Sequence, residues 1–113
     1  MKIAYTLIRA DGLIESHTDE FPGEPEGWYG EVRRLFSRHF GEDVFYEHVN
    51  VWHQGQYRDM FVDETGALKG LPVNAEASEI YHANVKAHFP DEANDDMPLI
   101  YGDALLFEQK VWV

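Results

Sequence analysis

The sequence predicts an α+β fold, in which a single domain over residues 1–113 has the element order ββ-α-ββ-α-β. The length suits one domain and is too short for two independent cores. Hydrophobic residues make up 44% of the chain, enough apolar surface to drive folding despite a formal net charge of −12. Apolar residues recur with the period of strands in most segments and with the period of helices in two. We expect a mostly antiparallel sheet with its two amphipathic helices packed on one face.

Two short strands are predicted at the start of the chain. Lys2–Arg9 alternates loosely between apolar and polar residues, which is typical of a half-buried strand. Ala10–Gly12 then gives a turn, because Asp-Gly suits the positive φ angles of tight hairpins. Leu13–His17 returns as the second strand, and Phe21–Glu26, with two prolines and a glycine, is predicted to be a loop.

The first helix is predicted over Gly27–Phe40. Its apolar stripe recurs at helical spacing and consists of Trp28, Val32, Leu35, Phe36 and His39. Gly41 follows at a place where helices commonly end.

A second pair of strands is predicted in the middle of the chain. Val44–His53 is rich in β-branched and aromatic residues and has apolar groups on both faces, which favours an interior strand. Gln54–Gly55 turns the chain, and Tyr57–Asp63 pairs back.

The second helix is predicted to begin after Asn74, a good N-cap residue, and to end at Pro90. Its buried stripe is expected to consist of Ala77, Ile80, Tyr81, Asn84, Val85 and His88. A polar loop follows. Leu99–Phe107 is predicted to be a strand, and Val111–Val113 a short terminal one.

Two segments of the chain resemble a known family. Asp63–Asn74 (DETGALKGLPVN) and Ile100–Phe107 (IYGDALLF) are similar to segments of small proteins from bacteriophages, plasmids and actinobacteria-type genomes, catalogued as domain of unknown function three-eight-four-six. The residues that carry the resemblance are Leu68, Lys69, Gly70, Leu71, Pro72, Asn74, Gly102 and Asp103. The resemblance implies an accessory protein of a phage or mobile element, expressed in the bacterial cytoplasm, and it implies no activity.

We interpret this motif as mainly architectural. Gly66 and Gly70 supply turn geometry, Pro72 stiffens the approach to the helix, and Asn74 caps it. Gly102 allows the last strand to bend or to pass close to a neighbour.

The composition excludes several classes of function. The chain has no cysteine, so it has no disulfide, no thiolate nucleophile and no cysteine-ligated metal. It shows neither a secretory signal nor an apolar run of about 18 residues that would span a membrane, and we expect a soluble, cytoplasmic protein. With 21 acidic and 9 basic residues, direct nucleic-acid binding is unfavourable, and a basic protein surface is the better complement.

The six histidines do not predict a metal site from their spacing. His48 and His53 lie on opposite faces of one strand, and His82 and His88 diverge by about 120° around one helix. A site assembled from distant segments, for example from His48 and Asp59, stays open as an alternative. The acidic stretch at residues 91–96 lacks the glycine and the ligand pattern of an EF-hand. We therefore predict no metal, no cofactor and no catalytic residue.

Candidate contacts with a partner come from one basic cluster and one tryptophan. Arg33, Arg34 and Arg38 form the only basic cluster, and we favour pairing with nearby acids, such as Glu31 with Arg34, over a site for an acidic partner. Trp112 would suggest a partner or dimer contact if it were exposed, because tryptophan is enriched in interfaces.

Three functions are compatible with these observations. The first is a non-enzymatic module that binds a protein of the host or of the mobile element. The second is a nucleic-acid-mimicking inhibitor of a host DNA-handling or defence protein, which requires the carboxylates to line one surface. The third is a small metal-dependent enzyme whose site includes His48 and Asp59. The sequence does not predict the oligomeric state.

Overall fold

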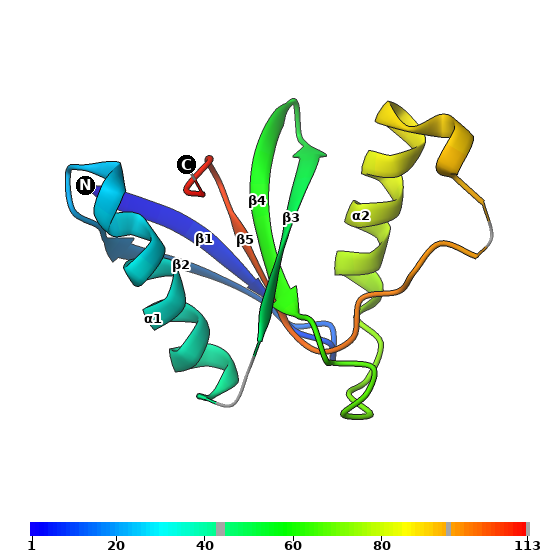
Figure 1. Ribbon diagram of the computed structural model, residues 1–113, viewed down its shortest axis with the longest axis horizontal. Coiled ribbons are helices and arrows are strands. Elements are labelled where there is room, and N and C mark those ends of the chain that lie inside the picture. Colours follow the sequence, from blue (N-terminus) through cyan, green and yellow to red (C-terminus); the bar gives the residue numbers. More distant parts are fainter. Residues whose placement is uncertain (43–44, 95, 113) are drawn as a thin grey trace.

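A five-stranded antiparallel sheet in the order β2-β1-β5-β4-β3 forms the centre of the structure, a computed structural model that describes residues 1–42, 45–94 and 96–112 (Figure 1). Its strands are β1 (Lys2–Ile8), β2 (Ile14–Glu20), β3 (Tyr46–His53), β4 (Gln56–Asp63) and β5 (Ala104–Phe107). The helices are α1 (Trp28–Phe40) and α2 (Ala75–His88), with short 3-10 turns η1 (Pro25–Gly27) and η2 (Pro90–Glu92). The predicted class, element order and antiparallel sheet are confirmed.

The last strand in the chain lies at the centre of this sheet. β5 pairs with β1 on one side, where Tyr5 is opposite Phe107, and with β4 on the other, where Met60 is opposite Leu106. β3 is an edge strand, so the prediction of an interior strand over Val44–His53 was wrong. Val44 itself lies outside the described residues.

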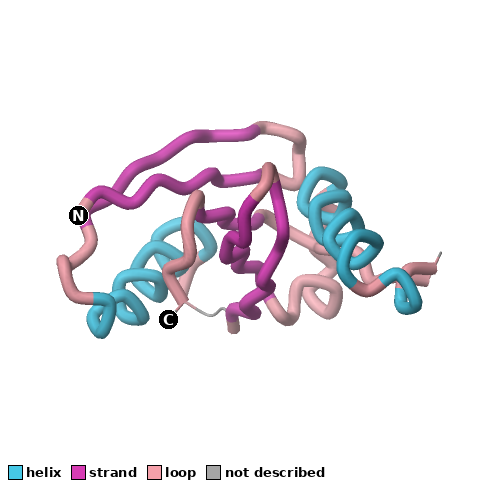
Figure 2. The backbone as a smooth tube through the Cα atoms, turned by 90° about the horizontal axis from the view of Figure 1, so that it is seen from above, coloured by secondary structure: helices cyan, strands magenta, loops and turns pink. Residues whose placement is uncertain are grey.

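The two helices lie on opposite faces of the sheet, and the expectation that both pack on one face was wrong (Figures 1 and 2). Successive residues of a strand point to opposite faces. Leu105 and Phe107 of β5 pack in the core under α1, whereas Ala104 and Leu106 pack in the core under α2. All four side chains of β5 are buried, because a central strand covered on both sides needs a continuous apolar run.

The predicted apolar stripes of the helices are largely confirmed. Trp28, Val32, Leu35 and Phe36 of α1 are buried. In α2 the buried residues are Ala77, Ser78, Ile80, Asn84 and Val85, whereas His88, which was expected in the stripe, is exposed. Within the described ranges no helix is both long and apolar enough to cross a membrane.

Asn74 holds the start of α2 against the sheet. Its side-chain oxygen accepts a hydrogen bond from the Ala77 backbone N–H at 3.0 Å, which confirms the predicted cap. Its amide nitrogen donates to the carbonyls of Ile8 and Gly102 at 2.8 and 3.0 Å. This fully buried side chain therefore joins α2, β1 and the segment before β5.

Most other residues of the family motif also contact one another or the sheet, whereas Leu68 is 89% exposed. Gly70 and Gly102 have positive φ angles of 71° and 84°, and a side chain at Gly102 would meet Leu71 at 2.8 Å. The N–H of Gly102 donates to the carbonyl of Pro72 at 2.8 Å. Lys69 binds the Asp63 carboxylate at 2.9 Å, and Asp103 accepts from the backbone of the first hairpin turn at 2.8 Å. These contacts agree with an architectural role.

The end of the chain is less regular than predicted. The strand expected over Leu99–Phe107 begins only at Ala104, and Tyr101 forms an isolated bridge with Val73. The strand expected at Val111–Val113 is wrong for residues 111 and 112, which belong to no strand. Val113 lies outside the described residues.

Candidate functional site

The predicted arginine cluster is divided between two environments. Arg34 and Arg38 each place a guanidinium nitrogen 3.2 Å from Asp19 Oδ2, and Arg34 also binds Glu31 at 2.6 Å. Burial raises the pKa of Asp19, but the Glu20 backbone N–H and the two guanidinium groups outweigh it, so this pKa lies below its ordinary value. Two arginines thus fasten α1 to β2, in agreement with the favoured pairing. Arg33 is exposed and lines a separate hollow.

Trp112 is packed against the sheet. Its ring stacks on His48 with centroids 5.8 Å apart and makes edge contacts with Tyr29, at 4.6 Å, and with Phe61. It joins the rim of the core beneath α1 and is half-buried. Part of this ring is therefore covered within the chain.

A buried carboxylate holds this tryptophan in place. Asp59 is fully buried, and its Oδ2 accepts hydrogen bonds from the backbone N–H groups of Val111 and Trp112 at 2.7 and 2.8 Å. Its Oδ1 contacts His48 Nε2 at 2.5 Å and the Lys110 ammonium group. Because an ionised carboxylate only accepts hydrogen bonds, His48 Nε2 is the donor in this contact.

All the hydrogen-bond acceptor positions of the Asp59 carboxylate are occupied. Burial raises the pKa of this carboxyl, but the bonds from His48, Lys110 and the two backbone groups outweigh it and lower the pKa to about 2. A carboxylate has about four acceptor positions, and four donors occupy them here. His48 and Asp59 do meet, as the metal-enzyme alternative required. Among the described residues, however, no three histidine or carboxylate side chains are arranged so that they could hold a metal ion.

A cluster of two histidines and one tyrosine lies beside α1, and no sequence pattern had indicated it. His39 Nε2 and the Tyr5 hydroxyl are 3.0 Å apart, and His17 stacks on the Tyr5 ring at 5.2 Å. Burial lowers the pKa of His39, with a smaller contribution from His17, and burial also raises the pKa of Tyr5. The three rings contact one another on the α1 face of the sheet, and Glu15 completes the set by contacting His17 at 3.2 Å. Alternation in β1 and β2 places Tyr5 opposite His17, but the approach of His39 depends on how α1 packs.

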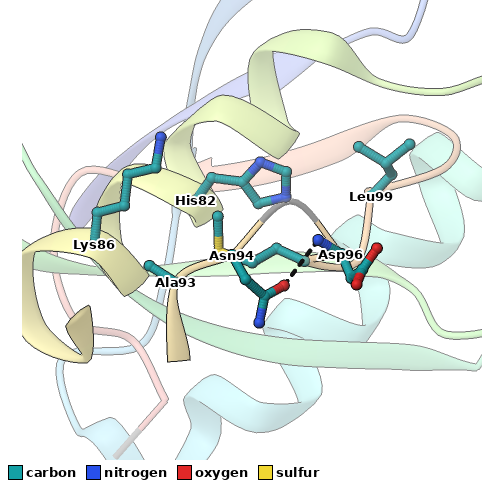
Figure 3. Close-up of a pocket in the computed structure, with 7 residues that line it drawn as sticks. His82, Lys86, Ala93, Asn94, Asp96 and Leu99 are labelled. Carbon is teal, nitrogen blue, oxygen red and sulfur yellow. Dashed lines mark hydrogen bonds between the residues drawn. The ribbon is translucent and has the colours of Figure 1, made fainter. Parts of the chain in front are cut away.

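A hollow lies between α2 and the loop that follows it (Figure 3). It has a volume of about 540 Å³. His82 bonds to the carbonyl of Pro98 at 2.7 Å, and Asn94 accepts from the backbone of Asp96 at 2.8 Å. Lys86 and Asp96 lie at opposite ends of the lining, with His82 and Asn94 between them. Asp95, part of the predicted acidic stretch, lies outside the described residues.

Exposed aromatic side chains gather at the tip of the β3–β4 hairpin. Trp52 and Tyr57 are directly opposite one another in the ladder and are 39% and 43% exposed. Their ring centroids are 4.9 Å apart, and His88 at the end of α2 contacts both rings at 5.5 and 5.6 Å. Phe89, the next residue, is 54% exposed. We refer to Trp52, Tyr57, His88 and Phe89 as the aromatic patch.

Sequence reasoning could have found part of this patch. The turn at Gln54–Gly55 fixes the hairpin register, which places Trp52 opposite Tyr57. The contact of His88 with these two rings joins segments that are distant in the sequence, so no local sequence pattern predicts it.

Comparisons of the chain with protein-family models, with curated proteins and with solved structures found no match. The resemblance to the phage- and plasmid-associated family therefore stays a prediction.

Proposed function

We propose that this protein is a non-enzymatic protein-binding module and that the aromatic patch is its principal contact surface. The observation that carries the proposal is the mutual contact of three partly exposed rings, Trp52, Tyr57 and His88, at one end of the molecule. Tryptophan and tyrosine are the residues that most often dominate binding energy in protein interfaces.

The geometry of the patch favours binding because its rings are already ordered. Trp52 and Tyr57 sit on paired strands, and the backbone N–H of Trp52 donates to the Asn84 side chain at 2.8 Å. Side chains held in place before association lose less conformational entropy on binding. The predicted contacts at Arg34, Arg38 and Trp112 are less available, because each is engaged within the chain.

The partner is expected to be a basic protein of the host or of the mobile element in its cytoplasm. The net charge of −12 complements a basic surface and opposes direct contact with nucleic acid. A nucleic-acid-mimicking inhibitor is a special case of this proposal, in which the bound protein handles DNA or RNA and salt releases it.

The proposal is tested by affinity capture from a lysate of the organism that encodes the protein. Tagged wild-type chain, a Trp52→Ala/Tyr57→Ala variant and a Phe45→Ala variant are compared at low and high salt. Phe45 is an exposed aromatic residue outside the patch and serves as the matched control. We expect one protein to be retained by the wild type and by the control, and to be reduced about tenfold or more with the patch variant.

Two results would contradict the proposal. One is the absence of any specifically retained protein. The other is equal retention by the patch variant and the wild type. A retained nucleic-acid-handling protein that high salt removes would favour the mimic, whereas retention through high salt would favour an apolar interface.

A further inference from the structure

Successive residues of edge strand β3 direct their backbone N–H and C=O groups alternately towards β4 and away from it. This alternation decides which backbone groups of β3 are free. Gln54 and Gly55 both have positive φ angles, 52° and 83°, which defines a two-residue hairpin closed by His53 and Gln56. In such a hairpin the closing pair exchanges both hydrogen bonds, and every second pair does the same. The odd-numbered residues of β3 therefore bond to β4. The even-numbered residues, 46 to 52, point their N–H and C=O groups outward.

One half of this outward edge is occupied by a side chain. Asn84 of α2 accepts from the N–H of Trp52 at 2.8 Å and donates to the carbonyl of Asn50 at 3.4 Å. Its amide thus bonds to the edge as a neighbouring strand would. Such covering protects exposed edges from unwanted pairing.

The other half of the edge is open. In the described part of the chain, no group bonds to the outward N–H or C=O of Tyr46 or His48. A groove of about 450 Å³ lies beside this stretch, between β3 and the segment that leads towards β5. Its walls are Glu47, His48, Val49, Asn50, Tyr81, Pro98, Leu99 and Ile100.

The groove has an apolar floor and acidic residues at its rim. Val49 and Tyr81 pack on the core beneath α2 and give it an apolar floor, and Leu99 is 44% exposed. Glu47 lines both this groove and an adjoining hollow that also contains Glu64. Both glutamates are exposed, so the rim of the groove is acidic where it adjoins this hollow.

We propose that the open half of the β3 edge binds an extended peptide segment with basic and apolar side chains, which adds to the sheet as a sixth strand. The backbone of His48 supplies one hydrogen-bond donor and one acceptor, whether the added strand runs parallel or antiparallel to β3. The stretch from Tyr46 to Asn50 spans about 13 Å, the length of about five extended residues. Glu47 binds a basic side chain, and an apolar side chain two residues along reaches Val49 and Tyr81.

The acidic rim also selects against the simplest alternative occupant, a second copy of this chain. Pairing two β3 edges about a twofold axis at Glu47 or His48 would place the Glu47 side chains of the two copies directly opposite or on a diagonal, and like charges facing each other in adjacent strands are destabilising. A basic peptide has the opposite effect. This proposal is independent of the aromatic patch, because Trp52, the residue of β3 in that patch, lies in the half of the edge that Asn84 covers.

The proposal is tested with the full chain and the peptide acetyl-Lys-Thr-Val-Thr-Lys-amide. This sequence is the same in both directions, so its lysines and valine share one face whichever way it binds. We expect backbone amide NMR signals of residues 46–50 to shift on titration, with a Kd of about 1 mM or tighter. The same peptide with the backbone N–H of every residue methylated keeps its side chains but loses these backbone donors, and we expect at least a tenfold loss of affinity.

Matched variants of the protein separate charge from backbone pairing. Glu47→Lys is expected to weaken binding about fivefold. Glu79→Lys makes the same charge change on an exposed position of α2 outside the groove and is expected to change affinity less than twofold. The Trp52→Ala/Tyr57→Ala variant should bind the peptide as the wild type does, so that failure of one proposal does not decide the other.

Three results would overturn the proposal. They are no binding at about 1 mM peptide, equal binding of the methylated peptide, and signal shifts located away from β3. Equal weakening by Glu47→Lys and Glu79→Lys would show attraction to net charge alone and would also overturn it.

Discussion

The two faces of the sheet are fastened by different chemistry. On the α1 face, ionised groups make the long-range connections: Asp59 binds the segment after β5, and Asp19 binds two arginines of α1. On the α2 face, neutral groups do the same work. Asn74 and Asn84 bond to backbone groups of the strands, and the Ser78 hydroxyl accepts from Ile100 at 2.8 Å.

This difference has a consequence for how the molecule responds to its surroundings. Carboxylates, guanidinium groups and imidazoles change with pH or are screened by salt, whereas amides and hydroxyls are not titrated. Acid should therefore loosen the α1 face while the α2 face keeps its hydrogen bonds. Three measurements test this contrast.

The largest effect is expected at Asp59. Asp59→Ala leaves Lys110 and two backbone N–H groups without their acceptor, and breaking such a buried set lowers the free energy of unfolding by about 4 kcal/mol. Urea denaturation followed by tryptophan fluorescence measures the change. Asp59→Asn keeps the shape and serves as the milder variant if the alanine variant does not fold. A loss below about 1 kcal/mol in both would show that the centre adds little to stability.

A somewhat smaller effect is expected at Asn74. Asn74→Ala removes the cap of α2 and leaves the carbonyls of Ile8 and Gly102 without their donor, a loss of about 3 kcal/mol. Because no titrating group is lost, the difference from the wild type should be the same at pH 7 and at pH 4. A difference that shrinks with acid would argue against the contrast between the two faces.

The smallest of the three effects is the response of the wild type to acid. The pKa of Asp59 is lowered from 3.8 to about 2, so its stabilisation is complete above pH 4 and is lost as pH falls through 2. The loss expected from this group is about 2 kcal/mol. Asp19 and Asp63 also have lowered pKa values and act in the same range. The Asp59 share is therefore the difference between the pH dependence of the wild type and that of Asp59→Asn. Parallel curves would contradict the assignment.

Local features of the fold were predictable from the sequence, and distant ones were not. The Asn74 cap and the turn at Gln54–Gly55 depend on neighbouring residues, and both were confirmed. The side of the sheet that each helix covers depends on β5. Its run of four apolar residues is the pattern of a strand buried on both faces, a pattern that was instead assigned to the edge strand β3.

The candidate site shows the same division. The hairpin register brings His48 near Asp59 as diagonal neighbours on one face, so their meeting could be considered from the sequence. The arrival of Lys110 and the Trp112 backbone, which close that centre, carries no local pattern. The contact of Asn84 with the edge of β3 likewise joins residues 32 positions apart.

The central position of β5 also determines when the sheet can form during synthesis. During synthesis both hairpins leave the ribosome before Ala104–Phe107 exists, and an isolated two-stranded hairpin is at best marginally stable in water. Neither hairpin can complete its apolar contacts until this short segment emerges and enters between them. Until then the apolar residues of the future core stay accessible to solvent. The joining step brings together segments that are far apart in sequence, which favours slow folding. A ribosome stalled before residue 104 would hold two unjoined halves, a natural target for chaperones.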